Sequence, residues 1–169
     1  MSRKRGNRIP DDFRRKLRSE DLSNLEGKTI LLLTQDEAGF PHPAMLSYRE
    51  MGSPDETRIR FAIWKGTTTG KNLRRHPMLT LIAVDGEMSY YLKGHVTILR
   101  EDAETFQGCS LYEFEAREVL EDKEPHLPIT TGIEYHHPDG PEPIESRRVH
   151  LTELNEGGFE VEMGREKFD

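Results

Sequence analysis

The chain has one cysteine, no long apolar run and no segment typical of export. Because Cys109 has no second cysteine to pair with, an internal disulfide framework is excluded, and we expect a reducing, cytoplasmic environment. No stretch approaches the ~18 apolar residues of a spanning helix, so we expect no membrane association. The 169 residues are 34% hydrophobic, which predicts one domain with a modest core of the kind that oligomerisation often completes.

Positive charge is concentrated at the start of the chain, although the net charge is -7. Residues 1–18 carry eight Lys or Arg side chains against Asp11 and Asp12, so the remainder is strongly acidic. We interpret residues 1–18 as a basic, flexible N-terminal segment and residues 19–169 as the folded domain. The acidic body argues against nucleic-acid binding.

Apolar residues along the first hundred positions follow the period of β-strands more often than that of helices. The alternation of Ile59, Phe61 and Ile63 is the clearest case. Short turns join consecutive strands, which predicts an antiparallel sheet and, with five or more strands, a closed or nearly closed barrel. Gly94 inside a strand indicates a bulge or a close backbone approach. We expect strands over 28–35, 42–50, 57–64, 78–84 and 88–99, and short helices within 10–27 and 71–76.

The pattern after Arg100 is less regular. Residues 100–107 have a helical composition, whereas 111–120 fit either a continuing acidic helix or a bulged strand. Further strands are predicted over 129–135, 147–154 and 157–164.

The segment "FAIWKGTTTGKNLRRHP" (61–77) has the composition of a phosphate site. It is not a nucleotide-binding P-loop, because only three residues separate Gly66 from Gly70 and Asn72 follows Lys71 where that motif needs Ser or Thr. Three threonine hydroxyls, flexible backbone and a lysine near a helix N-terminus nevertheless favour a phosphate. The alternative is that the threonines cap the helix and the basic residues form a solvated face.

The order of these elements resembles the FMN-binding split barrel proteins related to pyridoxamine 5'-phosphate oxidase. The resemblance runs from about Leu25 to Leu99, through "TILLLT", "GFPHPAMLSY", "IRFAIW", "TGKNLRRHP", "LTLIAV" and "YYLKGHVTIL". It implies a mainly β fold, an antiparallel split β-barrel with flanking helices. It also implies a homodimer in which the cofactor sites form between the two subunits.

Carried over residue by residue, the resemblance implies an FMN site. Its phosphate would be held by Lys71 and Thr69, with the hydroxyl of Thr68 beside them. Trp64 and Lys65 would lie along the cofactor, although the family usually has Thr where Lys65 stands. The remaining expected contacts are His42, Met45 and Ser47 on the second strand and Ser89 near the isoalloxazine ring.

Two functional hypotheses follow from the resemblance. The first is a cytosolic FMN oxidoreductase acting on an unidentified small molecule; because the flavin supplies the chemistry, no catalytic side chain is assigned. The second is a non-catalytic protein that holds FMN, the deazaflavin F420 or haem. Arg148 and His150 match an Arg-x-His tripeptide of the oxidase but are interpreted as ordinary strand residues. No metal site is predicted, because the adjacent His136 and His137 would point to opposite faces of a strand.

Overall fold

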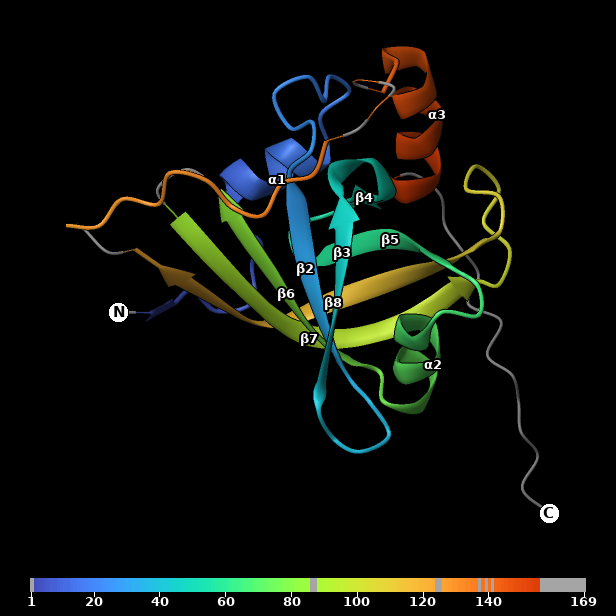
Figure 1. The fold of residues 1–169 in the computed structure, drawn as a ribbon, viewed down its shortest axis with the longest axis horizontal. Coiled ribbons are helices and arrows are strands. Elements are labelled where there is room, and N and C mark those ends of the chain that lie inside the picture. Colours follow the sequence, from blue (N-terminus) through green and yellow to red (C-terminus); the bar gives the residue numbers. More distant parts are fainter. Residues whose placement is uncertain are drawn as a thin grey trace.

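One antiparallel sheet, curled into a half-barrel, organises the chain (Figure 1). The structure is a computed structural model that describes residues 2–85, 88–123, 126–136, 138, 140 and 142–155. The strand predicted over 157–164 lies outside the described residues, as does His137.

The strand order in the sheet is β3-β2-β6-β7-β8-β5-β4, and a short β1 pairs with β8. Every pair of neighbouring strands is antiparallel, so the predicted split-barrel fold class is confirmed. The strands are β1 (Arg3–Lys4), β2 (Thr29–Gln35), β3 (Pro41–Ser47), β4 (Met51–Gly52), β5 (Arg58–Trp64), β6 (Met78–Asp85), β7 (Met88–Arg100) and β8 (Cys109–Asp122).

Alternation along the strands gives the sheet one buried and one partly open face. Ile59, Phe61 and Ile63 of β5 point into the main core together with Ile30 and Leu32 of β2. Burying such side chains stabilises the fold by about 1.5–3 kcal/mol each. The intervening positions of β2, β6 and β7 point to the other side of the sheet, which we call the outer face. Its partly or fully exposed apolar residues include Leu31, Leu33, Met45, Ile82 and Val84.

A β-bulge interrupts the pairing of β7 with β8. Lys93 pairs with Glu118 and Gly94 pairs with Ala116, so Arg117 has no partner on β7. A Cβ atom on Gly94 would lie 2.1 Å from the carbonyl oxygen of Glu115, a contact that only glycine avoids. Both meanings proposed for Gly94 from the sequence, a bulge and a close backbone approach, are confirmed.

Three α-helices and one 3₁₀ turn flank the sheet. Figure 1 shows α1 (Asp11–Leu17) and α3 (Ile144–Asn155) toward one end of the sheet, and α2 (Thr68–Arg75) toward the other, near the β2–β3 hairpin. The 3₁₀ turn η1 (Tyr48–Glu50) follows β3, where the sequence analysis expected the strand to continue.

The N-terminal segment takes part in the fold to a greater extent than its basic composition indicates. Phe13 and Leu17 of α1 are buried in the main core, and β1 extends the sheet beside β8. Its cations also have acidic partners: Lys4 pairs with Glu118 at 2.8 Å. The division of the chain at residue 18 therefore does not coincide with an edge of the core.

Three predictions made for the region after Arg100 need correction. Arg100 is the last residue of β7 and 101–107 form bends and turns, so no helix occurs there, and 147–154 lie in α3 instead of a strand. The segment 129–135 is extended but forms only an isolated bridge between Glu134 and Lys28. Of the two alternatives left open for 111–120, the bulged strand is the one observed, as part of β8.

Candidate functional site

The helix α2 begins after a turn formed by Gly66 and Thr67. Gly66 has a φ of 78°, a conformation that favours glycine, and leads into Thr67. The Thr67 hydroxyl donates to the carbonyl oxygen of Trp64 at 2.9 Å and accepts from the Gly70 N–H at 3.2 Å, so Thr67 is the N-cap. The α-helical hydrogen bonds start at Lys71, whose N–H reaches the Thr67 carbonyl at 3.1 Å. The helix therefore presents its first N–H groups and its positive dipole end at Thr68 and Thr69.

A buried amide fastens α2 to the ends of β2 and β3. Asn72 is 2% exposed, and its side-chain N–H donates to the Thr34 hydroxyl at 3.0 Å. The Thr34 hydroxyl in turn donates to the carbonyl oxygen of His42 at 3.3 Å. A side-chain N–H of Arg75 donates to the side-chain oxygen Oδ1 of Asn72 at 3.0 Å. This network fixes the helix beside His42, and the sequence analysis did not single out Asn72 or Thr34.

The cations around α2 differ in whether a carboxylate neutralises them. Two N–H groups of Arg74 donate to the two carboxylate oxygens of Glu101, and this pairing raises the pKa of Arg74 and lowers the pKa of Glu101. Lys71 is exposed and has no carboxylate partner among the described residues. The three paired cations and their partners are Lys65 with Asp102, Arg74 with Glu101, and Arg75 with Glu37.

The three predicted residues of β3 lie at different points along the edge of the sheet. His42 is half-buried at the end nearest α2, and Met45 is 55% exposed on the outer face. Ser47 is buried at the opposite end, where it caps η1. Its backbone N–H donates to Glu50 at 2.7 Å and its hydroxyl bonds to the same carboxylate.

Trp64 and Lys65 lie at the end of β5, directly before the turn into α2. The Trp64 side chain is 65% exposed and rests on Gly108, where a Cβ atom would lie 2.9 Å from the indole. The Lys65 ammonium is paired with Asp102. Ser89 lies far from this turn, because it is buried near the start of β7 opposite Val84 and Asp122.

The predicted residues therefore form two groups within one subunit. The first group gathers around the start of α2: Thr68, Thr69, Lys71, Trp64, Lys65 and His42. Ser47 and Ser89 form the second group at the other end of the sheet, and Met45 lies between the groups on the outer face.

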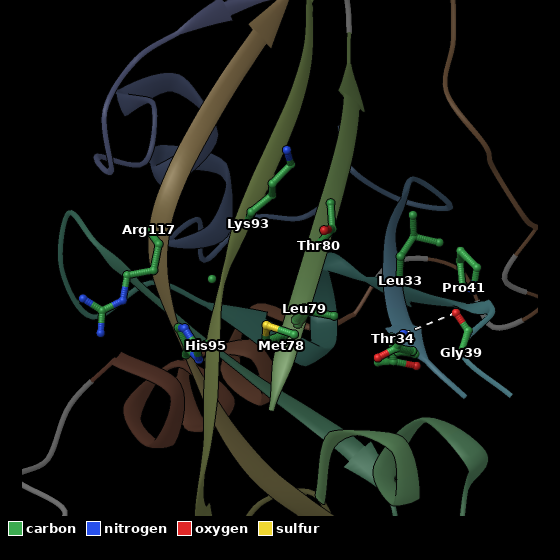
Figure 2. A pocket seen from close by; sticks show the side chains of 12 residues that line it. Leu33, Thr34, Gly39, Pro41, Met78, Leu79, Thr80, Lys93, His95 and Arg117 are labelled. Carbon is green, nitrogen blue, oxygen red and sulfur yellow. Dashed lines mark hydrogen bonds between the residues drawn. The ribbon is translucent and has the colours of Figure 1, made fainter. Parts of the chain in front are cut away.

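A cavity of about 510 Å³ opens on the outer face, and it is the second candidate site (Figure 2). None of the nine residues predicted to bind the cofactor lines it. It adjoins the second half of α2, because Thr34 and Gln35 line the cavity and accept hydrogen bonds from Asn72 and Arg75. Figure 2 shows Lys93, His95 and Arg117 on one side of the cavity and Leu33 and Pro41 on the other. The sequence signal that pointed here was Gly94, the glycine of the bulge.

Alternative reactive groups are few in the part of the chain that the structure describes. Burial, with the charge of Glu50, raises the pKa of the Cys109 thiol, which disfavours the reactive thiolate. No cluster of three or more His, Cys, Asp or Glu side chains that could hold a metal occurs within these residues. None of the helices described is long and apolar enough to cross a membrane.

Comparisons with known proteins agree with this fold. A sequence profile of the family described as pyridoxamine 5'-phosphate oxidase matches residues 22–134. The uncharacterized protein YclD of Bacillus subtilis (strain 168) is 28% identical over 120 residues, which cover 70% of this chain and 78% of YclD.

Solved structures resemble the fold at low sequence identity. A candidate pyridoxamine 5'-phosphate oxidase of Lactobacillus delbrueckii aligns with a TM-score of 0.54 and 14% identity, over 67% of this chain and 93% of that protein. HupZ of Group A Streptococcus aligns with a TM-score of 0.52 and 13% identity, over 75% of this chain and 99% of HupZ. At these identities the likeness extends to the fold and not to the site.

Proposed function

The chain belongs to the pyridoxamine 5'-phosphate oxidase family, and we propose that it is an FMN-binding flavoprotein that oxidises or reduces a small molecule. The phosphate of FMN would lie at the start of α2, held by the exposed ammonium of Lys71, by the exposed hydroxyl of Thr68 and by the N–H groups of Thr68 and Thr69, although the Thr69 residue is only 5% exposed. The flavin, when bound, supplies electron or hydride transfer, while the protein binds and orients it.

The observation that carries this proposal is the charge pattern around α2. Lys65, Arg74 and Arg75 each face a carboxylate, whereas Lys71 has none among the described residues and stands beside the N–H groups that begin the helix. A dianionic phosphate at this place would gain a full positive charge and the helix dipole. The Asn72–Thr34 network supports the proposal, because it fixes the position of the helix before any ligand arrives.

We further propose that the active form is a homodimer whose cofactor sites lie between subunits. Its support is the separation of the two groups of predicted residues within one chain, since Ser89 and Lys71 could contact one flavin only if they came from different subunits. Apolar residues available for such contact lie on the outer face, among them Met45, Leu31, Ile82 and Ile133. Sedimentation velocity of the purified protein tests this proposal, and a monomer at micromolar concentration would contradict it.

The substitution Lys71→Ala tests the phosphate site. Loss of one charge-assisted contact, about 1.5–3 kcal/mol, should weaken FMN binding about 10- to 100-fold without changing the melting temperature, because Lys71 is exposed. FMN affinity is measured by quenching of flavin fluorescence on titration with protein. Lys4→Ala, which removes the same charge from an exposed side chain of β1, is the matched control and should bind FMN as the wild type does.

Two outcomes count against the proposal. Unchanged FMN affinity in Lys71→Ala would mean that Lys71 does not bind the phosphate and belongs only to the solvated face of α2. A preparation that is colourless and does not alter flavin fluorescence would remove FMN altogether, and a haem or deazaflavin spectrum would replace it with another cofactor. Faster bleaching of the bound flavin by NAD(P)H than of free FMN is the result expected of a reductase.

A further inference from the structure

The β-bulge contributes one cation, Arg117, to the charged side of the cavity on the outer face. In a regular strand, neighbouring residues point to opposite faces, so Arg117 and Glu118 could not both point outward. The extra residue in β8 changes this: Ala116 and Val119 both reach the core, and both residues between them point outward. Bulges of this kind redirect side chains near functional sites. Here the bulge adds Arg117 to the outward-pointing Lys93 and His95 of β7.

The opposite side of the cavity is apolar. Leu33 of β2 and Pro41 of β3 form one wall, and Met78 of β6, which is 56% exposed, lies between that wall and His95 (Figure 2). The volume of about 510 Å³ falls within the roughly 300–1,000 Å³ of small-molecule sites. The cavity thus offers an apolar surface next to cationic groups that project from the two adjacent strands β7 and β8.

The carboxylates near these cations do not prevent them from binding an anion in the cavity. Lys93 lies 3.2 Å from Glu118, and Arg117 lies 3.1 Å from Glu115, but neither glutamate lines the cavity. All four side chains are well exposed or partly exposed, and ion pairs of this kind contribute little and exchange readily with other anions. The guanidinium of Arg117 also has more N–H donors than one glutamate occupies.

We propose that this cavity binds a small organic acid with a flat apolar body, whose acidic group contacts Arg117 and Lys93 and whose body lies over Leu33 and Met78. The proposal is independent of FMN binding, because none of the residues assigned to FMN lines the cavity. If the protein is an oxidoreductase, the position of the cavity beside α2 makes such an acid a substrate class to test first.

The test uses 1-anilinonaphthalene-8-sulfonate, an aromatic anion whose fluorescence rises in apolar surroundings, with the full-length protein. Arg117→Gln should weaken its binding about tenfold, and Lys93→Gln should weaken it less, because a guanidinium can hold the sulfonate through two N–H groups. Lys4→Gln is the matched control, since Lys4 pairs with the same Glu118 as Lys93 does but lies outside the cavity. N-phenyl-1-naphthylamine, a neutral analogue, should bind wild type and Arg117→Gln equally.

Three results would overturn the proposal. The first is wild-type affinity for the sulfonate in both cavity variants. The second is an equal loss of the charged and the neutral probe in Arg117→Gln at an unchanged melting temperature, which would show a purely apolar surface. The third is displacement of the probe by FMN together with weaker FMN binding in Arg117→Gln, which would make the cavity part of the flavin site. Failure of Lys71→Ala to alter FMN binding would leave the present proposal untouched.

Discussion

The helices α2 and α3 are each held in place by a buried nitrogen-bearing side chain, but the two side chains differ in charge. In α3 the guanidinium of Arg147 is 0% exposed and donates to four backbone carbonyl oxygens, of Leu17, Ser19, Arg49 and Met51, at 2.8–3.1 Å. In α2 the uncharged amide of Asn72 performs the attachment.

The two helices differ in whether a charged side chain remains free of internal contacts and could bind a ligand. Burial lowers the pKa of Arg147 to about 10, with the charge of Glu142 opposing this, so the side chain is charged at neutral pH and all its described contacts are internal. The carbonyl groups of Leu17 and Ser19 lie at the C-terminal end of α1, where the helix dipole favours a cation. A neutral amide holds α2 in place, and its two arginines are paired with carboxylates. Lys71 therefore remains available to bind an anionic ligand. Arg147 thus gives α3 a structural role, whereas α2 keeps an exposed cation for the phosphate binding that we propose for it.

Replacing Arg147 should give the largest effect on stability. Arg147→Met retains much of the side-chain volume but leaves four carbonyl groups without their donor, so we expect a loss of about 3–5 kcal/mol in the free energy of unfolding. Urea denaturation followed by circular dichroism measures it. The matched control is Arg148→Met, which removes an exposed side chain that pairs with Glu20 and should cost less than about 1 kcal/mol. Equal stabilities of the two variants would contradict the role given to Arg147.

The same arginine explains why the sequence did not predict α3. Positions 147, 151 and 154 are the buried face of a helix, but the first is an arginine, so the apolar pattern shows only Leu151 and Leu154. A strand was predicted there instead, but Val149, its apolar residue between Arg147 and Leu151, is 54% exposed. In β5 every residue that points into the main core is apolar. The alternation of apolar residues was therefore sufficient to predict both the strand and its buried face.

Long-range contacts account for another failed prediction, the helix expected over 100–107. The carboxylate of Glu153 in α3 accepts from the N–H groups of Glu104 and Thr105 at 2.7 and 2.8 Å, which satisfies this backbone without a helix. The local sequence around Glu104 cannot predict a hydrogen-bond partner that lies almost fifty residues away. The site divides in the same way: Lys71 was recognisable from a local motif, whereas Arg117 points into the cavity only because of pairing between β7 and β8.

Breaking the attachment of α2 should have a smaller effect on stability and a clear one on the ligand. Asn72→Ala should lower the free energy of unfolding by about 1–3 kcal/mol, because the buried Thr34 hydroxyl loses the N–H group that donates to it and Arg75 loses one of its acceptors. In a double-mutant cycle with Thr34→Val, we expect a coupling of about 0.5–3 kcal/mol. FMN affinity should fall in Asn72→Ala and remain unchanged in Arg147→Met where that variant is folded. Additive effects of the two α2 substitutions would refute the network.

The smallest effect concerns pH and again distinguishes the two helices. Burial acts to raise the pKa of Glu142, but the hydrogen bond and charge of His150, whose Nδ1 lies 2.6 Å from the carboxylate, together with Ser146 and Arg147, hold that pKa below its ordinary value. A carboxylate with a lowered pKa in the folded state stabilises the fold fully above its ordinary pKa, and this contribution disappears as the pH falls through the lowered value. Wild type should therefore exceed Glu142→Gln in stability at pH 6.5, and the gap should narrow steadily below about pH 4.5.

Urea midpoints across this range measure the gap, with Glu145→Gln as the control because Glu145 is exposed on the same helix. FMN affinity in Glu142→Gln should match the wild type at pH 6.5, since the Glu142–His150 pair belongs to α3 and its surroundings and not to the binding turn of α2. A gap that stays constant with pH would mean that Glu142 stabilises the fold through packing and not through its charge. A loss of FMN binding would mean that the two helices are not independent, and the separation of structural and binding roles would fail with it.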